Sequence, residues 1–218
     1  MTALFALDRK TNTLFDEDGR RFEAASRTWL AASRKKADAD SAEMLDAMAA
    51  VGWLQRESGN PLREPVGVIG PREATERQLA AALEVGELLG DCGLTVLCGG
   101  RHGVMQAVCE GIARVGGLSV GLLADKDASQ ANPFVSVAIA TGIGEARNAL
   151  IARASFCLIA IGDSLGTLSE VALGRQFGKT VIGLEGAADV DGVVQVASAR
   201  DAVERVAEAV VGVAEAGR

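Results

Sequence analysis

Three segments combine glycines with charged or hydroxyl-bearing side chains where an apolar run passes into a helical pattern. They are residues 99–105 (GGRHGVM), 141–148 (TGIGEARN) and 162–170 (GDSLGTLSE). Glycines let the backbone approach a ligand closely, and the N–H groups at a helix N-terminus attract anions. The three segments are therefore candidates for a site that binds phosphate.

In the first segment, Gly99, Gly100 and Gly103 provide a flexible turn around two side chains that bind anions. Arg101 and His102 can add positive charge or hydrogen bonds to this turn. The alternative is a tight turn in which the glycines only permit positive φ, with His102 as a hydrogen-bonded loop residue.

In the 162–170 segment, Gly166 and Thr167 stand at a helix start, where N–H and hydroxyl donors can hold phosphate together with Ser164. Glu170 follows one turn later, and its side chain leans back towards the loop. The alternative is that Glu170 only complements the helix dipole. Asp163 lies in the same loop and brings a negative charge to the expected site.

In the 141–148 segment, Gly144 permits a sharp entry into a helix whose first turn carries Arg147. An arginine at this place can bind a phosphate in a bidentate manner. Arg147 can equally pair with a carboxylate such as Glu145 or Glu170 as a structural tie.

From Val66 onward, apolar runs alternate with helical stripes. The expected strands lie at 66–70, 94–100, 118–124, 135–140, 156–162, 180–184 and 193–197. This alternation predicts an α/β fold with a doubly wound, mostly parallel, Rossmann-like sheet. Ligands bind such a sheet at the carboxyl ends of its strands, near the point where the strand order reverses. The three segments all follow strands, so we expect them to meet there.

Residues 1–64 differ from this pattern, so we expect an accessory N-terminal part before a binding domain at 65–218. The runs LFALD and TLF predict a hairpin. Apolar spacing then predicts helices over Phe22–Ala32 and Ala42–Gln55, separated by the charged segment 33–41.

Composition excludes two further classes of function. The chain has 218 residues, 26 glycines, one histidine, few aromatic residues and a net charge of −7. An acidic chain lacks the basic face that nucleic acids require, so we expect no nucleic-acid partner. A single histidine also excludes a multi-histidine metal centre, and we expect no bound metal.

The apolar segments and the cysteines indicate the cellular compartment of the protein. The longest strongly apolar stretch, Phe156–Ile161, is too short to cross a membrane, and the first residues show no export signal. The four cysteines form no zinc-binding spacing, which indicates buried thiols in a reducing compartment. We expect a cytoplasmic protein.

Taken together, the segments resemble the SLOG/LOG-like Rossmann superfamily, much of which was once labelled "lysine decarboxylase". The resemblance rests on GGRHGVMQAVCEGIARVGG, SVGLLADKDASQANPFVSVAIATGIGEARN and IAIGDSLGTLSEVALGRQFGKTVIGL, in this order over about residues 66–185. The GGxxGVM loop and the GIGEARN segment are most similar to the branch related to molybdenum-cofactor carrier proteins. This resemblance implies a homodimer or homotetramer that binds a small phosphate-bearing ligand, either a nucleotide or a molybdopterin-type cofactor.

LOG-type enzymes of the superfamily hydrolyse the N-glycosidic bond of cytokinin riboside 5′-monophosphates, and carry the motif P-G-G-x-G-T-x-x-E. Here Gly166, Thr167 and Glu170 match its second half, while residues 162–164 (GDS) replace Pro-Gly-Gly. Arg147 matches the arginine of the family's Arg-Lys pair, whereas asparagine follows it. The resemblance thus implies Arg147 and Glu170 as catalytic residues if the chain is an enzyme.

Three hypotheses remain. The leading one is a binding protein that holds a phosphate-bearing ligand without transforming it, because this role needs no intact catalytic motif. The alternative is a LOG-type phosphoribohydrolase of nucleoside 5′-monophosphates. The second alternative is a degenerate member that acts through protein interaction.

Overall fold

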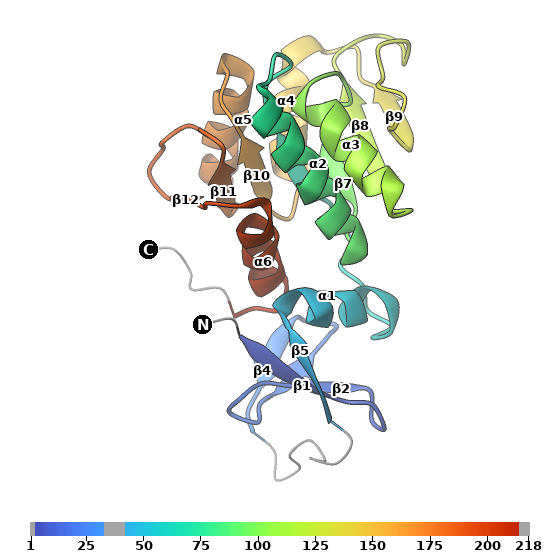
Figure 1. The fold of residues 1–218 in the computed structure, drawn as a ribbon, viewed down its shortest axis with the longest axis vertical. Helices are drawn as coiled ribbons and strands as arrows, with labels where there is room; N and C mark the ends of the chain where they lie inside the picture. Colours follow the sequence, from blue (N-terminus) through green and yellow to red (C-terminus); the bar gives the residue numbers. More distant parts are fainter. Residues whose placement is uncertain (1–2, 33–41, 214–218) are drawn as a thin grey trace. The chain divides into compact units, whose positions relative to one another are not determined.

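The computed structural model describes residues 3–32 and 42–213 (Figure 1). Contacts between Cα atoms group the described parts of Met1–Leu62 and Glu204–Ala216 into one compact unit, and Arg63–Val203 into another. The charged segment expected to separate two helices, residues 33–41, lies outside the described residues.

The first unit contains a five-stranded antiparallel sheet with the order β4-β3-β2-β1-β5. Its strands are β1 (Leu4–Asp8), β2 (Thr13–Phe15), β3 (Arg21–Glu23), β4 (Thr28–Leu30) and β5 (Ala42–Asp46), and helix α1 (Ala47–Arg56) follows. The expected hairpin is confirmed, since β1 and β2 pair antiparallel.

The helix predicted over Phe22–Ala32 is wrong, because β3 and β4 form a second hairpin there. Phe22 and Trp29 are seven residues apart, which suits one helix face, but in the structure they lie opposite each other on paired strands. The Trp29 ring also stacks on Phe5, and its Nε1 donates to the Val211 carbonyl at 2.7 Å. These partners are distant in sequence, so a local sequence pattern cannot predict the contacts between them.

The helix predicted over Ala42–Gln55 is partly wrong. Its first residues form β5, which pairs with β1, and α1 begins only at Ala47. Asp46 caps this helix by accepting a hydrogen bond from the Ala49 N–H at 2.8 Å.

The second unit contains a seven-stranded sheet with the order β12-β11-β10-β6-β7-β8-β9, in which every neighbouring pair is parallel. Its strands are β6 (Val66–Ile69), β7 (Val96–Cys98), β8 (Ser119–Leu123), β9 (Val137–Ala140), β10 (Leu158–Ile161), β11 (Val181–Leu184) and β12 (Val193–Gln195). Its helices are α2 (Glu76–Asp91), α3 (Val104–Arg114), the short η1 (Gly144–Ala146), α4 (Arg147–Ala154) and α5 (Leu165–Gln176). Helix α6 (Ala199–Val210) follows, and its residues from Glu204 onward belong to the first unit. The predicted doubly wound parallel sheet is confirmed.

Two pairs of helices cover this sheet. Helices α2 and α3 pack together on one face, and α4 and α5 pack together on the other (Figure 1). Glycines allow the first pair to approach closely, because a Cβ at Gly111 would clash with the Leu83 carbonyl oxygen. The central strands β6 and β10 are buried throughout, as their apolar sequences require.

The strand order reverses between β6 and β10. The chain runs from β6 outward to β9 and then returns to place β10 on the other side of β6. The crevice at the carboxyl ends of these strands is the expected ligand position in a doubly wound sheet. Within the described residues, no helix is both long and apolar enough to cross a membrane.

Candidate functional site

A cavity of about 520 Å³ lies at this reversal point, within the size range of small-molecule sites. The loops after β6, β7 and β10 and the first turns of α4 and α5 supply its walls. It is lined by Ile69, Gly70, Pro71, Arg72, Glu73, Gly99, Met105, Glu145, Arg147, Asn148, Asp163, Ser164, Gly166, Thr167 and Glu170.

Seven residues singled out in the sequence line this cavity: Gly99, Arg147, Asp163, Ser164, Gly166, Thr167 and Glu170. Five others do not line it: Gly100, Arg101, His102, Gly103 and Gly144. The three segments therefore converge at the carboxyl edge of the sheet, but each contributes only some of its residues.

Arg101 and His102 are engaged elsewhere. The Arg101 guanidinium is paired with the Asp125 carboxylate, with Nε 3.0 Å from Oδ2. His102 is exposed, and its Nδ1 lies 3.1 Å from Oε1 of Gln106. Gly103 has positive φ, and a Cβ there would meet the backbone of Pro71 and Arg72. Arg101 and Gly103 thus hold neighbouring loops together beside the cavity.

The floor of the cavity is a buried ion pair between α4 and α5. Arg147 Nη1 lies 3.1 Å from Glu170 Oε1, and it donates to Asn148 Oδ1 at 2.6 Å. The Asn148 amide in turn donates to Ser169 Oγ at 3.0 Å. Gly99 provides the space for the guanidinium, because a Cβ there would lie 2.5 Å from Arg147 Nη2.

Burial shifts the protonation equilibrium of Glu170 in this ion pair. Loss of hydration raises the pKa of the Glu170 carboxyl to about 7, and the neighbouring Arg147 only partly opposes this rise. Glu170 therefore exchanges its proton near neutral pH. Arg147 Nε is buried and has no hydrogen-bond partner among the described residues, which is uncommon for such a group.

One wall is the N-terminus of α5. Ser164 caps the helix, with its Oγ accepting from the Thr167 N–H at 3.1 Å and lying 2.9 Å from Thr167 Oγ1. Asp163 Oδ1 accepts from the Ser164 N–H at 2.8 Å. The space beside Gly166 is open, since a Cβ there would meet only Ser164 Oγ, at 3.8 Å. The positive end of the helix dipole thus faces the cavity.

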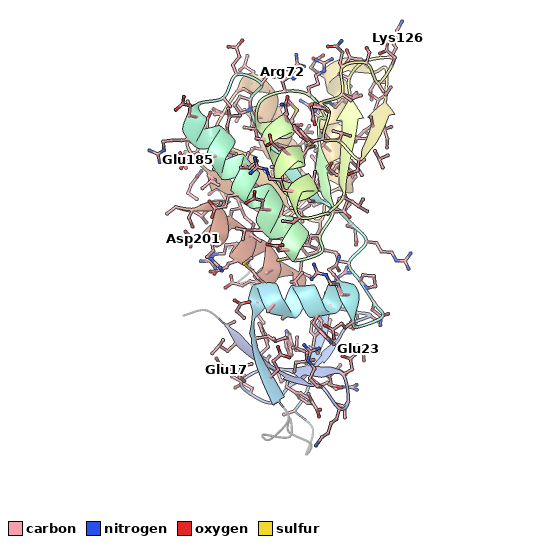
Figure 2. All side chains as sticks on the ribbon, turned by 45° about the vertical axis from the view of Figure 1, so that its right-hand side comes forward. Glu17, Glu23, Arg72, Lys126, Glu185 and Asp201 are labelled. Atoms are coloured by element: carbon pink, nitrogen blue, oxygen red, sulfur yellow. The ribbon has the colours of Figure 1, made fainter. Side chains whose placement is uncertain are left out.

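A further wall is the loop after β6, which the sequence patterns did not indicate as part of the site. This loop contributes Gly70, Pro71, Arg72 and Glu73 to the lining. The side chain of Arg72 extends from the end of its unit, is half exposed and lies 4.0 Å from Glu145 (Figure 2). The signal was present in the sequence, because VGVIG is a strand that ends in glycine and is followed by Pro-Arg-Glu.

The lining carries charges of both signs. Arg72 and Arg147 are positive, and the carboxyl groups belong to Glu73, Glu145, Asp163 and Glu170. A simple anion meets repulsion from several of these carboxylates, whereas a ligand with a phosphate and a set of N–H donors can satisfy both kinds of group. No group of three or more metal-ligating side chains occurs in the part of the chain that the structure describes.

Comparison with known proteins assigns this chain to a family. The chain belongs to the SLOG cluster4 family, which matches residues 63–213.

Several proteins are similar to this chain over the same region. The molybdenum cofactor binding protein from the phototrophic bacterium Rippkaea orientalis is 34% identical, with a TM-score of 0.65 over 68% of this chain and 99% of that one. The molybdenum cofactor carrier protein of Chlamydomonas reinhardtii is 32% identical, with a TM-score of 0.62 over 69% of this chain and 99% of that one. An uncharacterized protein of Archaeoglobus fulgidus is 39% identical over 127 residues, which are 58% of this chain and 83% of that protein.

Proposed function

We propose that this protein binds a phosphate-bearing cofactor of the molybdopterin type, or a related nucleotide, and holds it without transforming it. The observation that carries this proposal is the cavity at the strand reversal, where the α5 N-terminus and Arg72 face a set of carboxylates. The similarity of this chain to a molybdenum cofactor binding protein supports the same class of ligand. We further propose a cytoplasmic homo-oligomer, with 65–218 as the binding domain and 1–64 as an accessory part.

The phosphate belongs at the N-terminus of α5. The backbone N–H groups of the first turn, around Gly166, provide donors and the helix dipole provides positive potential. Arg72 adds a guanidinium that is half exposed and only loosely paired, so it is available to a ligand. Arg147 is less available, because its guanidinium is already bound to Asn148 and Glu170.

The remaining carboxylates suit the heterocycle. A pterin or a guanine presents an amino group beside a ring N–H, and a carboxylate accepts such a pair of donors in a bidentate manner. Glu73, Glu145 and Asp163 all line the cavity and offer such acceptors. Molybdopterin combines this donor edge with a phosphate, and the residues present therefore fit it. When bound, the cofactor supplies the dithiolene sulfur atoms that hold molybdenum.

Binding is favoured over hydrolysis by the state of Glu170. Hydrolysis of an N-glycosidic bond requires a carboxylate to stabilise an oxocarbenium-like state and an acid for the leaving base. Glu170 is buried, and its carboxylate is already paired with the Arg147 guanidinium. Asp163 replaces a glycine of the LOG motif, so the catalytic motif is not intact in this chain.

A LOG-type phosphoribohydrolase is the second candidate, because Arg147 and Glu170 do meet in the cavity and the pKa of Glu170 is about 7. A carboxyl group with this pKa is suited to acid–base catalysis at neutral pH. Release of ribose 5-phosphate from AMP or a cytokinin nucleotide, abolished in Glu170→Gln, would support this candidate over pure binding.

Arg72→Ala is expected to weaken molybdopterin binding by about 10–100-fold, because a hydrogen bond to a charged group contributes about 1.5–3 kcal/mol. Anaerobic calorimetric titration of the full chain measures this loss. Arg77→Ala is the matched control: it also removes one guanidinium, but this one pairs with Glu185 and does not line the cavity. Equal affinities for the two variants would contradict the role assigned to Arg72.

A further inference from the structure

Two buried cysteines lie on either side of the loop after β7, and neither has a role in the proposed function. Cys98 is the last residue of β7, and Cys109 lies on α3, which packs against this strand. Both side chains are fully buried, and both thiols are free. Their Sγ atoms are 3.5 Å apart, so two thiols from different elements are in direct contact.

This contact makes the two thiols chemically unequal. The hydrogen bond from the Cys98 thiol lowers the pKa of Cys109 to about 7, against the opposing effect of burial, and hydrogen bonds with Ser119 and Asn132 act in the same direction as Cys98. The bond to Cys109, together with burial, raises the pKa of Cys98 well above its ordinary value. Burial raises the pKa of the Cys157 thiol to about 12. Cys109 therefore ionises near neutral pH, and the thiolate is the form of cysteine that attacks an oxidant.

Hydrogen bonds connect the pair to the loop that follows Cys98. The Gly100 N–H donates to Cys98 Sγ at 3.3 Å. The Asn132 side-chain amide donates to the carbonyl oxygens of Gly100 and Arg101, at 3.1 and 3.0 Å. The loop and the two sulfur atoms thus form one hydrogen-bonded unit.

The same loop borders the candidate ligand cavity. Gly99 follows Cys98 directly and lines the cavity, where a Cβ would lie 2.5 Å from Arg147 Nη2. Met105 also lines the cavity, and its carbonyl oxygen lies 4.0 Å from Cys98 Sγ. A covalent change at Cys98 therefore acts on a segment that forms part of the cavity wall.

We propose that Cys98 and Cys109 are a peroxide-sensitive dithiol, which closes to a disulfide in the folded chain and restrains the loop beside the cavity. A disulfide bond is about 2.05 Å long, so the two sulfur atoms need to approach by only about 1.5 Å. The segment between the two cysteines would then be closed into a covalent ring that contains Gly99 and Met105.

The reaction takes place in two steps. The Cys109 thiolate attacks one oxygen of hydrogen peroxide and becomes a sulfenic acid, and the hydroxide that leaves takes up the proton that Cys109 released. The Cys98 sulfur then attacks the Cys109 sulfur and displaces hydroxide, which takes up the Cys98 proton. The two thiols lose two electrons in total, and peroxide is reduced to two molecules of water.

Burial selects the oxidant. Neither cysteine exposes any surface, so a bulky disulfide such as oxidised glutathione cannot contact the sulfur atoms. Hydrogen peroxide is nearly as small as water and can enter through small fluctuations of the fold. Oxidised glutathione should therefore add no mass to Cys98 or Cys109 in the folded chain, and an adduct on either would overturn the proposal.

The test counts free thiols in the full chain without ligand, so its outcome is independent of the proposed function. The folded protein is treated with hydrogen peroxide, quenched with catalase, and unfolded in the presence of N-ethylmaleimide. The chain has four cysteines, and mass spectrometry should find four labels before oxidation and two after it. Tryptic peptides 78–101 and 102–114 should then be linked. Four labels after oxidation, or a linked pair that includes Cys157, would overturn the proposal.

Cys92→Ala is the matched control, because Cys92 is also buried and lies in the same tryptic peptide as Cys98. This variant should keep the link and fall from three labels to one on oxidation. Cys98→Ala and Cys109→Ala should each keep three labels. The wild type and Cys92→Ala decide the pairing by themselves, so the test does not depend on the folding of the other two variants. Loss of the link in Cys92→Ala would overturn the proposal.

The restraint on the loop has its own readout. Amide hydrogen exchange in residues 99–108 should be slower in the oxidised than in the reduced wild type, because the disulfide closes a ring around this segment. Residues 181–184, in β11, should exchange equally in both states and are the internal control. Equal exchange of 99–108 in the two states would overturn the proposed restraint.

Discussion

The free energy of unfolding should fall by about 3 kcal/mol between about pH 5 and about pH 8 through the titration of Glu170 alone. The pKa of this carboxyl is about 7 in the folded chain and 4.5 in a solvated chain. Between these two values the folded state binds more protons than the unfolded state. The stabilisation is therefore fully present below pH 4.5 and is lost as pH rises through about 7.

Glu170→Gln should remove this dependence, because glutamine resembles the protonated acid and cannot ionise. Urea unfolding at several pH values measures the effect as the difference between wild type and variant, so the other titrating groups cancel. Glu145→Gln is the control, since it removes an exposed carboxylate from the same cavity and should keep the wild-type slope. A Glu170→Gln variant with the same slope as the wild type would show that Glu170 is not held in the described environment.

Gly166→Asp should weaken molybdopterin binding roughly a thousandfold while the protein stays folded. A carboxylate about 4 Å from a phosphate, at an effective dielectric near 20, repels it by about 4 kcal/mol per pair of unit charges. The fold tolerates the substitution because a side chain at Gly166 enters open space. An aspartate in the first turn of a helix is also favourable towards the helix dipole.

Gly166→Asn separates charge from bulk in this experiment, because asparagine has nearly the shape of aspartate without its charge. Calorimetric titrations should give a much smaller loss for asparagine than for aspartate. Thermal unfolding should show both variants at least as stable as the wild type. Equal affinities for wild type, Gly166→Asp and Gly166→Asn would exclude the α5 N-terminus as the phosphate position.

The parallel sheet could be predicted from the sequence because its strands are buried on both faces. A continuous apolar run such as 156–162 has few other places to lie, and β10 forms within it. The N-terminal sheet is different, because its short strands are held by distant partners. Phe22 and Trp29 have a spacing that suits a helix, but in the structure they pair across a hairpin and Trp29 stacks on the distant Phe5.

The position of the candidate site also followed from the sequence, since parallel strands bring their carboxyl ends to one edge. The contacts of the individual side chains could not be predicted as well from the sequence. Arg101 is 24 residues from Asp125, and a sequence gives no sign that this pair forms. Arg72 follows a glycine-ended strand, but the motifs that carried the resemblance lie in the other three loops.

Arg147 shows how burial changes the role of a residue that a motif suggests. The resemblance to LOG-type enzymes implied a side chain that contacts the ligand, and the structure places Arg147 at the cavity. Its guanidinium, however, is buried and divided between Asn148 and Glu170. We therefore assign the primary phosphate contact to Arg72 and the α5 N-terminus, with Arg147 as the support beneath them.

A crystal structure of the full chain grown with saturating molybdopterin under anaerobic conditions tests the central claim most directly. The account predicts the phosphate at the N-terminus of α5, within hydrogen-bonding distance of Arg72, and the pterin against carboxylates of the same cavity. Molybdopterin bound elsewhere on the chain, or a cavity that stays free of it at saturation, would contradict the account.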